Sequence, residues 1–401
     1  MDYITAKELA YSKIRPVDVG YPGQKPKLKK SVFEMRLQKL VAAIKEHDWD
    51  AVAIYGDREH YYNIKYFTDF GPRFEEALLV IHSDGKMACA LGNECIGLAK
   101  QSIQEIEPVL CSLFSLPNQP MESFVSGRQT LEDCGIKAGM KIGVIDWKLI
   151  SVVPDKSASF FPVYLFEALV ELVGSRHLIE NATGILIDPK DGIRIIQNED
   201  EIAELEYGAC IASQAVKDIM NTLTPGMSES GVSLVARTFG QPLSTHPTIK
   251  GGVNARKSMI SPTDNILQLG DEVSFSFGLE GGLSCRRAYL TSDGENIGVD
   301  PDEYIEEYVK PYMATVFNWY QMMEIGTEFG ELYKMVEETL PKEKFKWALN
   351  PGHYIGYEEW MSSPFFRDSK IKVTSGMVIQ MDIIPHNARF STPKCEDGLS
   401  G

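Results

Sequence analysis

The sequence predicts two domains, an α/β domain followed by an α+β domain, in a chain of 401 residues. Candidate strands alternate with candidate helices over residues 31–185, which is the pattern of an α/β domain with a mixed sheet. In the second half, two helices are followed by several strands, which is typical of an α+β domain. Turn residues between short β-branched runs at 184–198 indicate the boundary, so we expect domains at 1–190 and 191–401.

Local patterns justify the elements of the first domain. The first 30 residues are rich in proline and lysine and predict an extended arm, and a helix begins near Ser31, whose capping-box partner is Glu34. Ser83, Asp84 and Gly85 predict the turn of a hairpin. The other expected elements are strands at 51–55, 77–81, 87–91 and 141–146 and helices near 94–106 and 163–174.

The second domain opens with the clearest helix of the chain. Its apolar residues recur every three or four positions, and it runs from Asn198 or Asp200 to Pro225 and Gly226. A second helix is expected near Ser228, before the pattern changes to strands. The remaining expected elements are strands at 246–253, 271–279, 286–291 and 372–385 and a helical section at 302–337.

Composition and charge exclude several classes of protein. Lys and Arg total 40 against 56 for Asp and Glu, and the resulting charge of −16 repels nucleic-acid phosphates and anionic membrane surfaces. The seven cysteines include no Cys-x-x-Cys pair, which excludes a zinc ribbon and favours reduced thiols. The N-terminus lacks the features of a signal peptide, and no apolar window is long enough for a membrane span. We therefore expect a cytoplasmic protein without nucleic-acid or membrane partners.

Several segments, in the same order along the chain, resemble the pita-bread superfamily of creatinase, prolidase, aminopeptidase P and methionine aminopeptidase. They are a Pro-Gly-x-Ser-Glu corner at 225–229, a Gly-x-Asn-Ala loop at 252–255, the run 260–276, a Gly-His-x-Ile-Gly motif at 352–356, a Gly-Met-Val motif at 376–378 followed by Asp382, the pair Glu396-Asp397, and residues 63–70 in the first half. The resemblance implies a creatinase-like α/β N-terminal domain, a pita-bread C-terminal domain and an ancestor that hydrolysed C–N bonds. It also implies a homodimer in which one N-terminal domain reaches the pocket of its partner.

Metal-dependent members of this superfamily hold two divalent ions with two Asp, one His and two Glu side chains, because bridging carboxylates reduce the repulsion between the ions. The positions that correspond in this chain are Ser276, Arg287 (or Cys285 or Arg286 if the turn slips), His353, Asp382 and Glu396. A guanidinium never binds a cation. The resemblance therefore implies a divergent member without most metal ligands, and we expect neither a metal nor another cofactor.

The positions that move protons in relatives also differ. The acid/base histidine of creatinase corresponds to Met259, and a second histidine of the superfamily corresponds to Trp360. Neither a thioether nor an indole transfers protons near neutral pH. Candidate catalytic residues are therefore His353, Asp382 and Glu396. Further candidates, if their loops turn inward, are Glu280, Glu358 and Glu359.

A pit that lost its metal but kept Asp382 and Glu396 would bury two repelling carboxylates. We hypothesise that Arg286 or Arg287 supplies the missing positive charge, with binding of a substrate carboxylate or an ordinary structural role as alternatives. Cys285 lies beside these cations and is expected to have a lowered thiol pKa. The other expected substrate contacts are His246, Ser276, Met259 and Trp360.

Two functions stay open. The first is a metal-independent hydrolase of a C–N bond in a small amide, amidine or short peptide, in which His353 handles protons, the two carboxyl groups orient water and the arginines bind substrate. The second is a non-catalytic protein that docks a peptide or small molecule. The chain stops at Gly401, so we expect either a truncated C-terminus or a poorly anchored Glu396.

Overall fold

The computed structural model describes residues 2–13, 17, 20–119, 125–150 and 155–400. The chain divides into two compact units. The N-terminal unit is Leu28–Ile195, and the C-terminal unit combines Met1–Lys27 with Ile196–Gly401. Among the described helices, none is long and apolar enough to cross a membrane.

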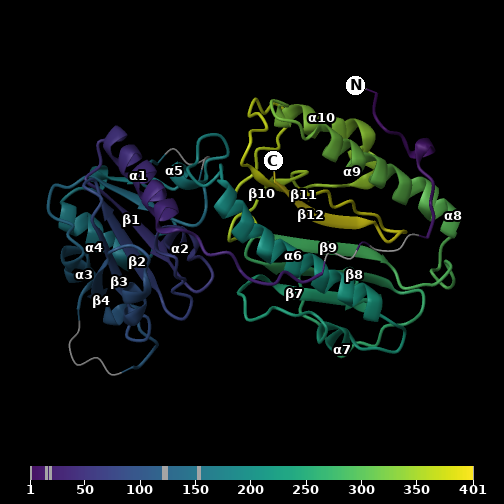
Figure 1. Cartoon of the computed structure of the whole chain (residues 1–401), viewed down its shortest axis with the longest axis horizontal. Helices are drawn as coiled ribbons and strands as arrows, with labels where there is room; N and C mark the ends of the chain where they lie inside the picture. Colours follow the sequence, from purple (N-terminus) through teal and green to yellow (C-terminus); the bar gives the residue numbers. More distant parts are fainter. Residues whose placement is uncertain (1, 14–16, 18–19, 120–124, 151–154, 401) are drawn as a thin grey trace. The chain divides into compact units, whose positions relative to one another are not determined.

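The N-terminal unit is built on a mixed six-stranded sheet in the order β4-β3-β2-β1-β5-β6 (Figure 1). The pairs β3–β4, β1–β5 and β5–β6 are parallel, and the other pairs are antiparallel. The central strands are almost wholly buried, as expected for strands that are covered on both faces. The strands are β1 (Ala51–Gly56), β2 (Ala77–His82), β3 (Met87–Leu91), β4 (Glu107–Leu110), β5 (Ile142–Ile145) and β6 (Ile179–Asn181).

The helices of this unit follow the predicted alternation in most places. The segment expected to be helical near 94–106 forms only a short 3-10 helix, Ile96–Gln101. The helices are α1 (Lys30–Glu46), α2 (Tyr62–Thr68), α3 (Gly127–Asp133), α4 (Val163–Val173) and α5 (Gly184–Ile187), with further 3-10 turns at Ser112–Phe114 and Arg176–Leu178.

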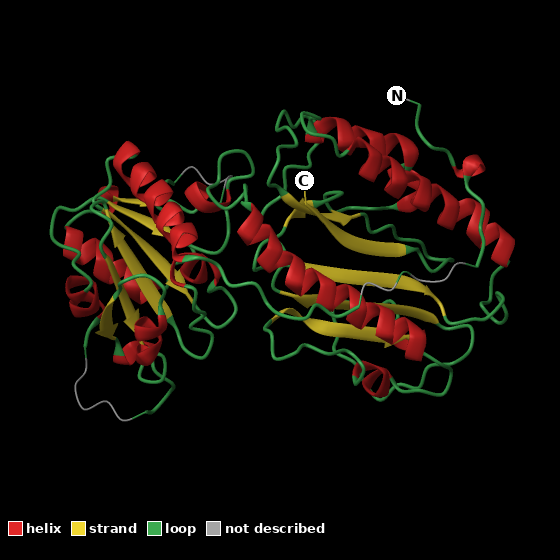
Figure 2. Ribbon diagram, in the orientation of Figure 1, coloured by secondary structure: helices red, strands yellow, loops and turns green. Residues whose placement is uncertain are grey.

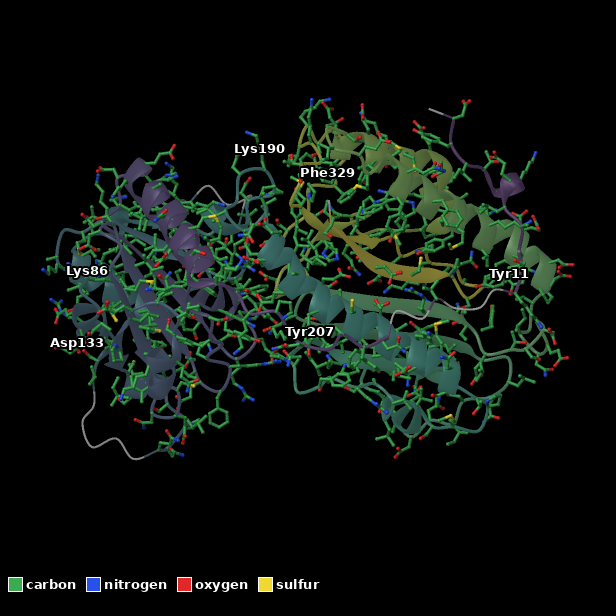
Figure 3. The ribbon with its side chains drawn as sticks, viewed as in Figure 1. Tyr11, Lys86, Asp133, Lys190, Tyr207 and Phe329 are labelled. Carbon is green, nitrogen blue, oxygen red and sulfur yellow. The ribbon has the colours of Figure 1, made fainter. Side chains whose placement is uncertain are left out.

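The C-terminal unit contains an antiparallel six-stranded sheet in the order β10-β11-β12-β9-β8-β7 (Figure 1). Figure 2 shows its strands in yellow and the helices of the unit in red. Helices cover its outer face, and Tyr207 of α6 and Phe329 of α10 mark two of them in Figure 3. The strands are β7 (Leu243–Gly251), β8 (Glu272–Leu279), β9 (Gly282–Tyr289), β10 (His353–Tyr354), β11 (Val378–Asp382) and β12 (Lys394–Ser400). The helices are α6 (Glu199–Thr222), α7 (Glu229–Ser233), α8 (Pro301–Tyr304), a π-helical turn (Ile305–Val309), α9 (Lys310–Met322), α10 (Phe329–Thr339) and α11 (Lys342–Phe345), with 3-10 turns at Ala6–Glu8 and Gly252–Asn254.

Alternation along β8 separates an apolar face from a polar face. Val273, Phe275 and Phe277 are buried in one core with the apolar residues of α6. Because successive strand residues point to opposite faces, Ser274 and Ser276 lie on the inner face, away from α6. The inner face of the sheet is therefore the polar surface on which the site is built.

Two of the motifs that carried the resemblance meet at the edge of this sheet. The Glu229 carboxylate of the Pro-Gly-x-Ser-Glu corner accepts hydrogen bonds from the Gly251 nitrogen (2.9 Å), the Asn254 amide (3.1 Å) and the Thr263 nitrogen (3.0 Å). Burial would raise the pKa of Glu229, but these hydrogen bonds lower it below its usual value. The hydrogen bonds of this buried carboxylate thus connect α7 with β7 and with the loop after β7.

The N-terminal arm packs on the C-terminal unit, whereas the sequence placed it in a domain at 1–190. Ile4 donates its backbone N–H to Asn318 Oδ1 of α9 at 2.8 Å and accepts the Asn318 amide at 2.9 Å. Farther along, the Tyr21 hydroxyl donates to Asp218 of α6 at 2.5 Å. The arm is too polar to form a core of its own, so hydrogen bonds to distant helices decide where it packs.

The close contact between α6 and the β8–β9 turn gives a stability prediction. A Cβ atom added at Gly208 of α6 would lie 1.8 Å from the Glu280 carbonyl oxygen. Gly208→Ala should therefore lower the free energy of unfolding by about 1–3 kcal/mol, although Gly→Ala within a helix normally stabilises. Thermal denaturation measures this, with Asn221→Ala at an exposed position of the same helix as the control. Equal stability of the two variants would contradict the tight contact.

Candidate functional site

Five side chains form a continuous row across five strands of the inner face, which we call the polar row. The register places Thr248 opposite Ser276, Ser276 opposite Cys285, Cys285 opposite Glu396, and Glu396 opposite Asp382. All five residues are between 1% and 5% exposed. Thr248 and Ser276 share a hydrogen bond of 2.7 Å between their hydroxyl groups. The polar row brings together four of the residues that the sequence singled out.

His353 lies beside this row, since it pairs with Gln380 of β11 two residues from Asp382. Its ring is fully buried and stacks on Trp360, with ring centroids 4.1 Å apart. Nε2 lies 3.3 Å from Glu359 Oε1, and Nδ1 lies 3.2 Å from the Tyr354 carbonyl oxygen. Trp360 and Glu359 thus both contact the His353 ring, and the expected contact of Trp360 with a substrate stays a prediction.

The fixed position of His353 has a local cause in the preceding loop. The indole Nε1 of Trp319, which is fully buried in α9, donates to the Pro351 carbonyl at 2.8 Å. A side chain at Gly352 would collide with the Phe365 ring, which a Cβ atom would approach to 2.6 Å. The Gly-His motif therefore places its histidine through close packing of the backbone against aromatic rings.

Asp382 and Glu396 form a buried carboxyl pair on adjacent strands. Burial first, and then the charge of Glu396, raise the pKa of Asp382 well above its usual value. Asp382 thus keeps its proton to higher pH than an ordinary aspartic acid. The pair carries less negative charge than two ionised carboxylates would.

Lys394 supplies the positive charge next to this pair. Its Nζ lies 2.5 Å from Glu396 Oε1, and the two side chains are only 19% and 5% exposed. Burial would lower the pKa of Lys394, but the acidic groups of Cys285, Glu396 and Asp382 raise it above its usual value. The hypothesis of a fixed cation beside the carboxylates is therefore met by a lysine and not by the expected arginines.

The two arginines lie on opposite faces of β9. Arg286 pairs in register with Cys395, faces away from the polar row and binds Asp397 through NH2 at 2.8 Å. Arg287 lies on the inner face opposite Lys394, but its NH2 pairs with Glu272 at 3.2 Å. The assignment of Arg286 to the site was wrong, because neighbouring strand residues face opposite ways.

Cys285, and not Arg287, occupies the row position next to Ser276. The reason is the turn between β8 and β9, where only Glu280 and Gly281 separate the two strands. Burial, followed by the charge of Glu396, raises the pKa of Cys285 to about 12. The expected lowering of this pKa was wrong, because burial of the thiol outweighs the nearby cations.

His246 and Met259 do not join the buried group. Both are exposed, and Nε2 of His246 donates to the Met259 carbonyl at 2.9 Å. Their expected contact with a substrate stays a prediction.

Comparison with known proteins agrees with this geometry. Residues 203–384 match the family model described as metallopeptidase family M24. The C-terminal unit, in which this match lies, is therefore similar to this family. Comparison with curated protein sequences gives no match.

Solved structures of this superfamily share the fold of the whole chain. A prolidase from Pyrococcus horikoshii OT3 is 17% identical, with a TM-score of 0.68 over 91% of this chain and 94% of its own. A Xaa-Pro dipeptidase from Bacillus anthracis is 15% identical, with a TM-score of 0.67 over 91% and 94%. Aminopeptidase P from E. coli is 14% identical, with a TM-score of 0.63 over 93% and 92%. The predicted fold, an α/β domain followed by a pita-bread domain, is confirmed.

The side chains of the polar row do not fit a two-metal centre. Where the superfamily has two aspartates, this chain has a neutral serine hydroxyl and a thiol that keeps its proton, Ser276 and Cys285. The Lys394 ammonium already binds Glu396, which would otherwise face a metal. Within the described ranges, no group of three or more His, Cys, Asp or Glu side chains is arranged to hold a metal ion.

Lys394 is the residue that the superfamily motifs did not reveal. It precedes Glu396 by two positions, and side chains at that spacing in a strand lie on the same face. The Lys-x-Glu spacing was thus a readable signal, provided that residues 394–400 were recognised as a strand.

The Lys394–Glu396 pair predicts a large loss of stability when its cation is removed. Lys394→Met leaves the Glu396 carboxylate buried without its partner, which should cost about 3–5 kcal/mol of unfolding free energy. Lys370→Met breaks an exposed pair with Glu328 and should leave stability almost unchanged. Chemical denaturation of both variants at neutral pH tests the contrast, and similar losses would contradict it.

The raised pKa of Asp382 predicts a pH dependence. A carboxyl group whose pKa is higher in the folded protein destabilises it increasingly as the pH rises above its unfolded pKa of about 4. Asp382→Asn removes this ionisation and should make the free energy of unfolding fall less steeply between about pH 4 and pH 7. Denaturation curves across this range measure the slope. A steeper fall in the variant would show that Asp382 is ionised and stabilising.

Proposed function

We propose that the C-terminal unit is a metal-independent binding domain for a peptide or small molecule, derived from a Xaa-Pro peptidase-like ancestor. The observation that carries this proposal is the buried ion pair between Lys394 and Glu396. A lysine ammonium provides a single fixed charge and offers no Lewis-acid function. The Lys394 charge therefore supports the proposal that this polar surface is stable without a bound divalent ion.

The state of the other buried groups also favours binding over hydrolysis. Acid/base catalysis requires a group that accepts a proton and can reach the reacting water. Cys285 keeps its proton, the Ser276 hydroxyl is bonded to Thr248, and Lys394 stays charged beside Glu396. These groups lack the activation that a nucleophile or general base needs.

A second candidate function is metal-independent hydrolysis of a C–N bond. One observation favours it, namely that Asp382, whose pKa is raised by burial, lies in the same buried group as the His353–Glu359 pair. Asp382 would then protonate the leaving nitrogen, and His353 would take a proton from water. Loss of turnover in His353→Ala would identify this function.

Metal titration and activity assays test the proposal together. We expect no stoichiometric binding of Mn²⁺, Co²⁺ or Zn²⁺ in calorimetry, and no hydrolysis of Xaa-Pro dipeptides or creatine above the buffer rate. One or two metal ions bound per chain would contradict metal independence. Metal-free turnover that His353→Ala abolishes would replace the binding function with the hydrolase.

The quaternary and cellular setting belongs to the same proposal. We propose a cytoplasmic homodimer. The dimer rests on the resemblance to creatinase and prolidase, and the location rests on seven scattered cysteines without a paired motif. The mass measured by light scattering in solution tests the dimer.

A further inference from the structure

A second row of side chains lies next to the polar row and carries positive charge. This second row lies two residues along each strand from the polar row. In the register of the sheet, Lys250 lies opposite Ser274, Ser274 opposite Arg287, and Arg287 opposite Lys394. We call Lys250, Arg287 and Lys394 the cation row. Like charges at directly opposed strand positions destabilise a sheet. Although the chain has a net charge of −16, this row therefore needs negative charge close to it, from neighbouring carboxylates or from a ligand.

Carboxylates within the unit compensate only part of this charge. Glu396 pairs with Lys394, and Glu272 is shared between Arg287 at 3.2 Å and Arg256 at 2.8 Å. In the described part of the chain, the three cations of the row and the neighbouring Arg256 thus share only two carboxylates in ion pairs, Glu272 and Glu396. Two of these four positive charges have no carboxylate of their own there. The acidic residues of the pit do not neutralise the cation row.

Two donors of the row lack an acidic partner. Among the described residues, no carboxylate lies within ion-pair distance of Lys250 Nζ, which donates instead to the carbonyl oxygens of Lys257 and Ser258. Burial, followed by the charges of Arg287 and Lys394, lowers the pKa of Lys250. The Nε atom of Arg287 is buried and has no hydrogen-bond partner within the described part of the chain. An unpaired buried donor costs free energy unless a ligand or water satisfies it.

We propose that the cation row binds a small oxyanion, a carboxylate or phosphoryl group, above Ser274 between Lys250 and Arg287. Ammonium and guanidinium groups form charge-assisted hydrogen bonds with such oxygens, and the Ser274 hydroxyl lies between the two cations. The side chains of Arg287 and Lys394 keep 14% and 19% exposure, so the row is partly open to solvent. This inference rests on the proposed binding function, since it names the chemical group that anchors the ligand.

Binding of defined anions tests the proposal. Inorganic phosphate and N-acetylglycine are titrated by calorimetry into the full chain at low salt, with N-acetylglycinamide as the uncharged probe. We expect at least one anion to bind and the amide not to bind. Lys250→Gln should weaken binding at least about tenfold, because it removes one charge-assisted contact, whereas Lys250→Arg should keep it. Arg286→Gln is the matched control, since it removes a cation from the opposite face of the same strand.

Each outcome supports or overturns the site. Binding of phosphate alone identifies a phosphoryl ligand, and binding of N-acetylglycine alone identifies a carboxylate. The proposal fails if neither anion binds, or if Lys250→Gln and Arg287→Gln both bind as the wild type does. Lys250→Gln breaks no ion pair, so its folding is expected to be intact and is checked by its thermal denaturation. The anion result is read separately from the metal and turnover assays, so failure of the proposed function is distinguishable from failure of the site.

Discussion

The ion pair between Lys394 and Glu396 is the contact on which the character of the site depends. A buried charge is tolerated only when a partner or hydrogen bonds replace its water. In this unit the partner is a side chain of the same strand, which comes with the folded chain and does not depend on ion concentration. Ser276 and Cys285, which stand where the superfamily has two aspartates, bring no negative charge that would need a further cation.

The charges of the polar row can be followed across the strands. Where the superfamily has several carboxylates around divalent ions, this chain has two hydroxyl groups, a thiol, a carboxyl group with a raised pKa and a carboxylate that binds a lysine. The row therefore carries less negative charge than a set of ionised carboxylates would. The neighbouring cation row is positive, because its cations outnumber their carboxylates. The inner face thus places the cation row, with its net positive charge, directly beside the polar row.

Much of the fold and part of the site could be read from the sequence. Ser276, His353, Asp382 and Glu396, which were chosen by their distance from short motifs, lie near one another in the structure. The arginine hypothesis failed at one turn, whose length decides whether residue 285, 286 or 287 joins the row. Since a shift of one residue moves a side chain to the other face, no residue pattern within β9 could decide it. Glu396 is well anchored, since β12 pairs with both β11 and β9, although Pro393 and Cys395 obscured this strand in the sequence.

The contact between Ile4 and Asn318 has a consequence for how the chain is made. These residues are 314 positions apart, so the arm leaves the ribosome long before its partner helix exists. The N-terminal unit lies between them in sequence and can complete its own core first, as domains generally do during synthesis. The arm therefore cannot dock on α9 until that helix has been synthesised. Closing this long loop makes docking of the arm a late, non-local step of folding.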